Sequence, residues 1–135
     1  MAGRLGATSL KRLGDCHPKL QRLLREVDQR LSKRKLFDLT VVCGHRGQAE
    51  QEQAFQDHRS TKHWPESKHN TLPSRAVDIA PYPTDWGDRE AFALLAGYVL
   101  AVADDLDIEV DIGALWKKFP DLPHVELTDW ELNRP

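Results

Sequence analysis

The stretch SKHNTLPSRAVDIAPYP, residues 67–83, decides the predicted fold because it joins a polar loop to a short apolar segment that carries a carboxylate. The run AVDIA has the composition of a buried strand, yet Asp78 stands in its middle. A buried carboxylate without a partner costs several kcal/mol or takes up a proton. The sequence therefore predicts that a cation or a set of hydrogen-bond donors faces Asp78 in the folded chain.

Helical and strand patterns flank this stretch on both sides. From His17 and Pro18 to Leu31, apolar residues recur at the spacing of one buried helix face, and proline is well tolerated in a first helical turn. Asp88 is a suitable cap for a second apolar helix. The expected helices are 18–31, 48–58 and 88–103, and the expected strands are 36–43, 75–80, 107–112 and 123–127.

The connecting segments complete the prediction. We expect a loose start before His17, a long loop over residues 59–73 that is either functional or disordered, and a polar tail after residue 127. Pro81 and Pro83 are expected to stop the strand that contains Asp78. Strands and helices in this order predict an α+β fold rather than a doubly wound sheet.

Size and composition indicate one soluble globular domain over residues 1–135, and we expect a monomer. Apolar residues make up 40% and charged residues 30%, and no apolar stretch approaches the roughly 20 residues that span a bilayer. The basic opening lacks the apolar run of a secretory signal. We therefore expect synthesis in the cytoplasm without stable membrane insertion, and Cys16 and Cys43 to be reduced structural thiols.

Charge is unevenly distributed, with ten Lys and Arg against three Asp and Glu in residues 1–35 and four against thirteen in residues 76–135. A basic amino-terminal segment could face an anionic polymer, or it could be the solvated side of a helix that packs near the acidic half. The segment lacks interleaved aromatic residues and the net charge is -2, so we expect no nucleic-acid partner.

Two histidines are placed to partner Asp78. His69 lies in the long loop before the strand, and His124 lies in the last predicted strand. Two imidazoles and one carboxylate are a normal ligand set for catalytic zinc and leave a fourth position open for water. Each histidine could instead be a partly buried hydrogen-bonding residue. The remaining histidines, which we do not expect to be ligands, are His17, His45, His58 and His63.

Asp121, three residues before His124, is a candidate general base, because a carboxylate beside the attacking water can take its proton. Glu126, two residues after His124, is the rival base. Arg46 could act as a fixed cation for a substrate carboxylate or a developing oxyanion. Each residue also has a purely structural alternative. Asp121 could be a turn residue, and Arg46 could simply pair with an Asp or a Glu.

These motifs resemble the zinc peptidases of the D-alanyl-D-alanine carboxypeptidase and L-alanoyl-D-glutamate endopeptidase family, and most closely its small single-domain phage endolysins. The likeness rests on Ser67-x-His69, then Ala76-Val77-Asp78, then Asp121-x-x-His124, and it covers nearly the whole chain. It implies a small antiparallel sheet that carries zinc and is flanked by helices, the D,D-peptidase or hedgehog-like fold.

The resemblance also implies roles for single residues. One Zn²⁺ per chain would bind His69, Asp78 and His124, with Asp121 as base and Arg46 as a second catalytic residue. Ser67 would bind substrate. The implied function is hydrolysis of the L-alanyl-D-glutamate bond of bacterial peptidoglycan by a phage or prophage endolysin that moves from the host cytoplasm to the cell wall.

Two departures and two rivals accompany the resemblance. His69 and Asp78 are nine positions apart, farther than in the usual family pattern, and Pro73-Ser74 stands where the family has glycine. The base is aspartate rather than glutamate. A D-alanyl-D-alanine carboxypeptidase would use the same chemistry on another bond, and a non-catalytic zinc-stabilised domain would use the same ligands without a reaction.

Overall fold

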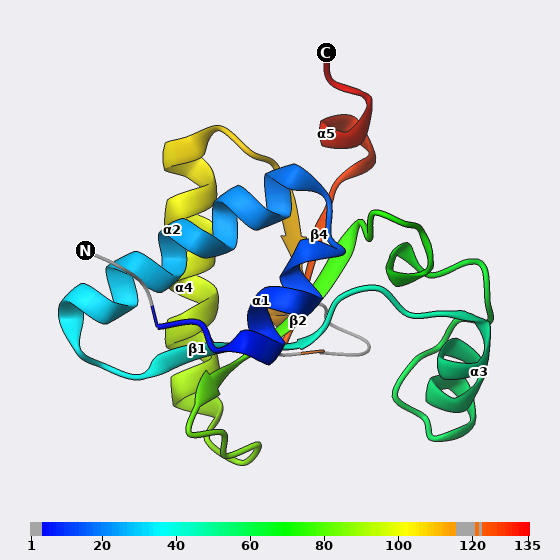
Figure 1. The fold of residues 1–135 in the computed structure, drawn as a ribbon, viewed down its shortest axis with the longest axis horizontal. Helices are drawn as coiled ribbons and strands as arrows, with labels where there is room; N and C mark the ends of the chain where they lie inside the picture. Colours follow the sequence, from blue (N-terminus) through cyan, green and yellow to red (C-terminus); the bar gives the residue numbers. More distant parts are fainter. Residues whose placement is uncertain (1–3, 116–120, 122) are drawn as a thin grey trace.

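The computed structural model describes residues 4–115, 121 and 123–135 and confirms the α+β architecture (Figure 1). The helices are α1 (Ala7–Gly14), α2 (Pro18–Arg34), α3 (Gln48–Gln56), α4 (Arg89–Leu106) and α5 (Asp129–Asn133), with short 3-10 helices η1 (Lys68–Asn70) and η2 (Gly113–Leu115). The strands are β1 (Asp38–Cys43), β2 (Ala76–Tyr82), β3 (Val110–Ile112) and β4 (His124–Leu127).

The described strands form one antiparallel sheet in the order β1-β2-β4-β3. β2 lies inside the sheet, and its Asp78 pairs with Cys43 of β1 on one side and with His124 of β4 on the other. The sheet register therefore sets Asp78 and His124 side by side, although they are far apart in the sequence.

The two faces of β2 and β4 have different surroundings. One face shares a hydrophobic core with α2 and α4, which pack on each other and over the sheet (Figure 1). The core side chains of these two strands are Val77, Ile79, Val125 and Leu127. Side chains alternate along a strand, so Asp78, His124 and Glu126 lie on the other face. The core thus sets the direction in which the polar side chains point.

β2 is longer than the sequence predicts. It continues past Ala80 through Pro81 to Tyr82, which pairs with Asp38 of β1. The backbone N–H of Ile79 points away from β1, toward Pro123, and alternation gives Pro81 the same direction. Proline is tolerated there because no described strand requires a donor on that side of Pro81.

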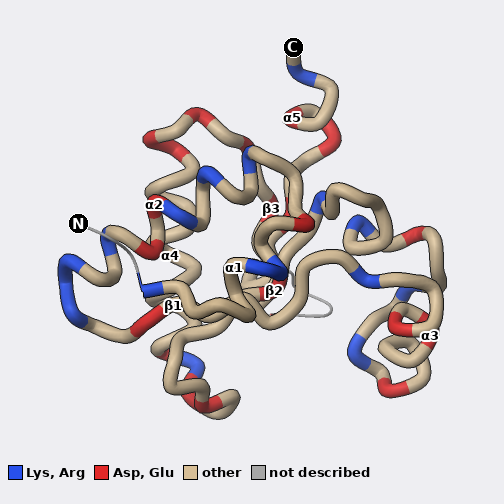
Figure 2. Tube along the Cα trace, in the orientation of Figure 1, with Lys and Arg blue, Asp and Glu red and all other residues tan. Residues whose placement is uncertain are grey.

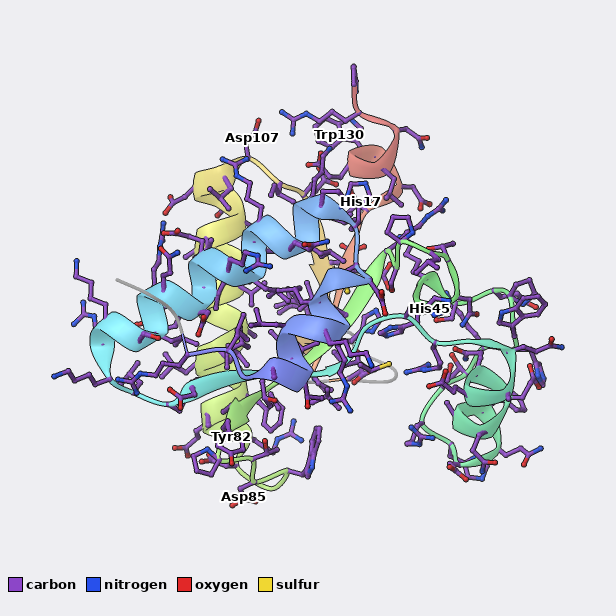
Figure 3. The ribbon with its side chains drawn as sticks, in the orientation of Figure 1. His17, His45, Tyr82, Asp85, Asp107 and Trp130 are labelled. Carbon is purple, nitrogen blue, oxygen red and sulfur yellow. The ribbon has the colours of Figure 1, made fainter. Side chains whose placement is uncertain are left out.

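β3 is shorter than the predicted strand 107–112. Asp107 adopts a left-handed conformation with φ of 56° and ends α4 (Figure 3), and Val110 begins the strand. The backbone N–H groups of the helix end bond back to its last turn, which is the geometry of a helix C-cap. The first residue of the predicted strand, Asp107, is therefore the C-cap of α4 and does not belong to the sheet.

Two of the described α-helices were not expected from the sequence. α1 occupies the predicted loose start, and its Ser9 hydroxyl accepts a hydrogen bond from Val41 N at 3.0 Å. α5 occupies the polar tail, and its Glu131 is 1% exposed. Lys19 Nζ lies 2.5 Å from Glu131 Oε2, and Glu109 N donates to Oε1 at 2.7 Å. Contacts with distant segments stabilise both helices, so local sequence patterns do not reveal them.

The uneven charge is partly neutralised within the fold. Figure 2 shows Lys and Arg along α2, and Asp and Glu near the carboxyl end of α4 and in α5. Arg30 of α2 pairs with Asp105 of α4 at 2.8 Å. Among the described residues, no helix is both long and apolar enough to cross a membrane. Cys16 and Cys43 are free thiols, as predicted.

Candidate metal centre

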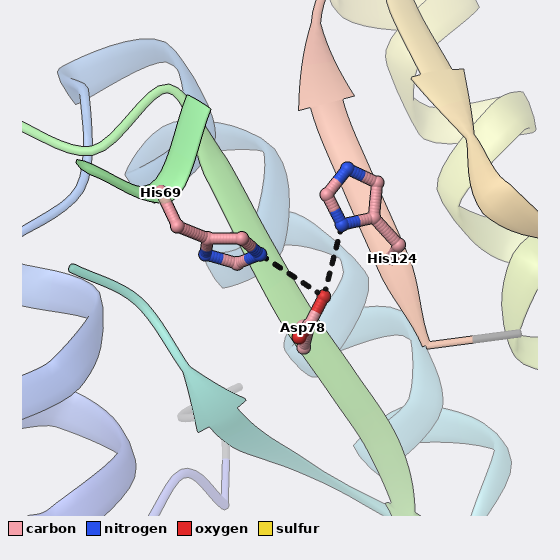
Figure 4. Close-up of side chains that lie close together, drawn as sticks. All are labelled: His69, Asp78 and His124. Atoms are coloured by element: carbon pink, nitrogen blue, oxygen red, sulfur yellow. Dashed lines mark hydrogen bonds and ion pairs between the residues drawn. The ribbon is translucent and has the colours of Figure 1, made fainter. Parts of the chain in front are cut away.

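Asp78 faces two imidazoles on the face of the sheet opposite the core (Figure 4). Its Oδ1 lies 3.3 Å from Nε2 of His69 and 3.1 Å from Nδ1 of His124. One donor atom from each of these three residues lies within 4.8 Å of the others. The three predicted ligands thus form a group that could hold a metal ion, and the longer gap between His69 and Asp78 does not prevent their convergence.

The orientation of His69 is set by its neighbours. Its Nδ1 lies 2.7 Å from the carbonyl oxygen of Gly44, so Nδ1–H donates and Nε2 carries the lone pair. Ser67 Oγ accepts from His69 N at 3.2 Å and caps η1. The described residues include no hydrogen-bond partner of good geometry for the buried Nε2, although Asp78 Oδ1 is 3.3 Å away. A lone pair that faces a carboxylate needs a proton or a metal cation between them.

His124 has the complementary arrangement. Its Nε2 lies 2.8 Å from Glu126 Oε1, while Nδ1 faces Asp78. Glu126 also contacts Lys68 Nζ at 2.8 Å. Glu126 is therefore held on the far side of the imidazole from Asp78, which does not fit the rival role of general base. A carboxylate that accepts from the second nitrogen of a histidine is a common way to orient a metal ligand.

The ionisable groups of the metal-free site shift one another strongly. Burial lowers the pKa of His69, but the Asp78 carboxylate 3.3 Å from its Nε2 outweighs this effect, and the pKa rises to about 10. Burial also lowers the pKa of His124, and Asp78 and Glu126 raise it above its usual value. Burial raises the pKa of Asp78, but both histidines bring it well below the usual range. Protons and a metal ion would therefore compete for the same nitrogens.

Arg46 lies against this group and is only 8% exposed. Its Nη2 is 3.6 Å from Asp78 Oδ2, and its Nη1 donates to Gln51 Oε1 at 3.0 Å. Its backbone N–H donates to His69 O at 2.8 Å. The predicted cation is thus part of the same cluster, and the backbone contact ties it to η1.

Asp121 lines the same hollow as Asp78 and His124. Its backbone N–H donates to Gly113 O at 3.0 Å, and its carbonyl oxygen accepts from His124 N at 3.1 Å. Burial and the charge of Asp78 raise the pKa of Asp121, although the nearby cations oppose this shift. A carboxylate with a raised pKa next to a metal-binding group is suited to proton transfer.

The three candidate ligands His69, Asp78 and His124 are called the metal group below. A cleft of about 1050 Å³ opens beside this group and has Asp78, Arg46 and Asp121 in its wall. Trp86 also lines it and stacks on Phe92, with ring centroids 5.4 Å apart. A smaller hollow of about 60 Å³ contains the His69, Asp78 and His124 group itself. The cleft is large enough for a peptide and leads to the group.

Two histidines that were not expected to be ligands make contacts elsewhere in the fold. His17 stands at the start of α2 (Figure 3), and its Nδ1 accepts from Lys19 N at 3.1 Å. His63 Nδ1 lies 2.9 Å from Glu52 on α3. Neither histidine belongs to the ligand group of the described residues.

Gln51 and Lys68 are site residues that sequence reasoning missed. Gln51 is fully buried and contacts both Arg46 and Asn70. Lys68 pairs with Glu126. Both side chains contact site residues that are distant in the sequence, so no local pattern identifies them. For Lys68, the sequence signal is its place between Ser67 and His69.

Comparison with known proteins agrees with this geometry. Residues 1–130 match the model of the family described as phage L-alanyl-D-glutamate peptidase. The chain belongs to this peptidase family. Among solved structures, the Serratia marcescens L-Ala D-Glu endopeptidase ChiX matches with a TM-score of 0.77 and 28% identity, over 93% of this chain and 91% of that chain. No curated protein matches the chain. The predicted family, fold and peptidase class are thus confirmed.

Proposed function

We propose that this peptidase is a zinc-dependent endopeptidase that hydrolyses the L-alanyl-D-glutamate bond in the stem peptides of bacterial peptidoglycan. The observation that carries the proposal is the buried Nε2 of His69, which faces Asp78 Oδ1 at 3.3 Å beside a cleft of peptide size. Family membership supports the choice of bond.

His69 through Nε2, His124 through Nδ1 and one oxygen of Asp78 would hold the zinc ion. Two imidazoles and a carboxylate are a common ligand set for catalytic zinc. Calcium and magnesium prefer ligand sets made of oxygen atoms alone, so this set favours zinc. When bound, zinc would supply Lewis-acid activation of the scissile carbonyl and of the attacking water.

The chain's own residues would move the proton and balance the charge. Asp121 would accept a proton from the attacking water and donate it to the leaving amine. Arg46 would stabilise negative charge on the scissile carbonyl oxygen, since a guanidinium has five N–H donors and the contacts with Gln51 and Asp78 leave others for substrate. Ser67 would contact substrate in addition to capping η1.

The biological setting is part of the same proposal. A phage or prophage endolysin would accumulate in the host cytoplasm and act on the wall after release, as a single domain and a monomer. The family description as a phage peptidase supports this setting.

The direct test is mass spectrometry of fragments released from purified peptidoglycan by the zinc-loaded protein. New amino-terminal D-glutamate is the expected product, and Asp121→Ala should lower kcat by about 10²- to 10⁴-fold. Asp104→Ala, an exposed change on α4, is the matched control and should keep full activity.

Other products would contradict the proposal in different ways. Free D-alanine would indicate a D-alanyl-D-alanine carboxypeptidase. Absence of any product from a folded protein with zinc bound would indicate a non-catalytic domain. If His69→Ala retained both zinc binding and cleavage, the ligand assignment would be wrong.

A further inference from the structure

Residues 59–62, with the sequence Arg-Ser-Thr-Lys, line the small hollow that contains the His69, Asp78 and His124 group. Their side chains offer two cations and two hydroxyl groups and no acid. The rest of the hollow includes the carboxylates of Asp78 and Asp121. One wall of the hollow is therefore rich in donors that suit an anion.

Gln51 holds this segment in place from inside the protein. Its Nε2 donates to Ser60 Oγ at 2.9 Å and to Lys62 O at 2.7 Å. Its Oε1 accepts from Arg46 Nη1 and from Asn70 Nδ2, both at 3.0 Å. Because Gln51 is fully buried, these four contacts link the 59–62 segment to the metal group through a shielded network.

Arg59 has its charge available for a ligand. Within the described part of the chain its ion-pair partner is Asp57 at 3.3 Å, in an exposed pair of the kind that contributes little. Arg59 lines both the small hollow and the large cleft. Arg46 is more committed, since it contacts Asp78 and Gln51. Arg89, at the start of α4, lines the large cleft but not the small hollow.

The chemistry of the proposed substrate places a carboxyl group next to the scissile bond. The D-glutamyl residue contributes its amine nitrogen to the scissile bond. It has two carboxyl groups, and when the peptide continues through one of them the other is free. In a peptide extended through the side-chain carboxyl, the free carboxylate is attached to the Cα next to the scissile nitrogen. It must therefore lie immediately beside the reacting bond. Residues 59–62 line the small hollow that contains the candidate ligands, whereas Arg89 lines only the large cleft.

We propose that residues 59–62 form a subsite for the free carboxylate of the D-glutamyl residue, with Arg59 as its charged contact, an inference that rests on the proposed function. The subsite selects stem peptides in which this carboxyl group is ionised over those in which it is a carboxamide. Thr61 and Lys62 add donors to the subsite, and Gln51 positions the segment.

The test combines two substrates with three forms of the zinc-loaded full chain. The synthetic peptides contain L-Ala-D-Glu extended through the side-chain carboxyl, and they differ in carrying a free main-chain carboxylate or a carboxamide. The proteins are the wild type, Arg59→Met and the control Arg89→Met. Arg59 has a 60% exposed side chain, so its replacement leaves the core intact, and circular dichroism checks the fold.

We expect the wild type and Arg89→Met to prefer the carboxylate peptide by about 10- to 100-fold in kcat/KM, mainly through KM. Arg59→Met should lose this preference because its kcat/KM for the carboxylate peptide falls to the level of the carboxamide peptide, and Arg59→Lys should recover part of it. Equal cleavage of both peptides by the wild type, or an undiminished preference in Arg59→Met, would overturn the subsite while leaving the proposed function intact. If the wild type cleaves neither peptide, the proposed function itself fails and the subsite with it.

Discussion

Glu126 contacts a proposed zinc ligand, His124, and is not itself one of the proposed ligands. It accepts from His124 Nε2 at 2.8 Å and pairs with Lys68 at 2.8 Å, so it fixes which imidazole nitrogen faces Asp78. Glu126→Ala should weaken zinc binding by about 10- to 100-fold, and Glu126→Gln should have an intermediate effect. Competition with a chromophoric chelator measures the affinity.

The control for this change is Glu90→Ala, an exposed replacement at the start of α4 that should leave the zinc affinity unchanged. Unaltered affinity in Glu126→Ala would show that His124 is oriented by its other contacts. The prediction therefore separates the role of the Glu126 carboxylate from that of the surrounding backbone.

The histidines also predict how zinc affinity depends on pH. Asp78 outweighs burial and raises the pKa of His69 to about 10, and the pKa of His124 is raised as well. The His69 imidazole of the metal-free protein therefore holds a proton near neutral pH, His124 keeps its proton to a higher pH than a free imidazole, and zinc must displace these protons. The logarithm of the association constant should rise with pH between about 6 and 8, with a slope of up to about 2. Calorimetry in buffers of different ionisation enthalpy counts the released protons, and a flat profile would contradict the pKa directions.

At the scale of elements, the junction of β3 and η2 sets the position of the proposed base. A Cβ on Gly113 would lie 2.1 Å from the backbone oxygen of Asp121, which no side chain can tolerate without movement. Gly113→Ala should therefore displace the Asp121 backbone, lower the free energy of unfolding by about 1–3 kcal/mol and reduce kcat.

Gly97→Ala is the matched control for this substitution. Its Cβ would meet no atom within 4 Å, and it lies inside α4, where alanine is favoured over glycine. It should raise the free energy of unfolding by about 0.5–1 kcal/mol with normal turnover. Urea denaturation and steady-state kinetics measure both variants, and equal behaviour of the two would refute the close contact as the cause.

At the scale of the whole molecule, the proposed metal joins η1, β2 and β4, which are distant in the sequence. A ligand that binds only the folded chain stabilises it by an amount that grows with the logarithm of the ligand concentration relative to Kd. Zinc at about 100 times its Kd should add about 2.7 kcal/mol and raise Tm by about 10 °C. Differential scanning calorimetry with and without a chelator tests this, and His69→Ala should show no zinc-dependent shift.

The sequence by itself determined the elements with strong periodicity and the identity of the proposed ligands. The apolar stripe of α2 and the single carboxylate within the AVDIA run are local features, and each restricts which side of its element is buried. The place of Asp78 in that run predicted that a cation or hydrogen-bond donors would face it. The motifs around His69 and His124 then indicated the partners of that carboxylate.

Only the tertiary structure decided how these residues act. The nitrogen that each histidine presents depends on Gly44 and Glu126, and the position of the 59–62 segment depends on Gln51. α1 and α5 are likewise stabilised by contacts with β1 and α2. Hydrogen bonds and burial join groups that are far apart along the chain, and their energies depend on the folded geometry, so local patterns of residues cannot reveal them.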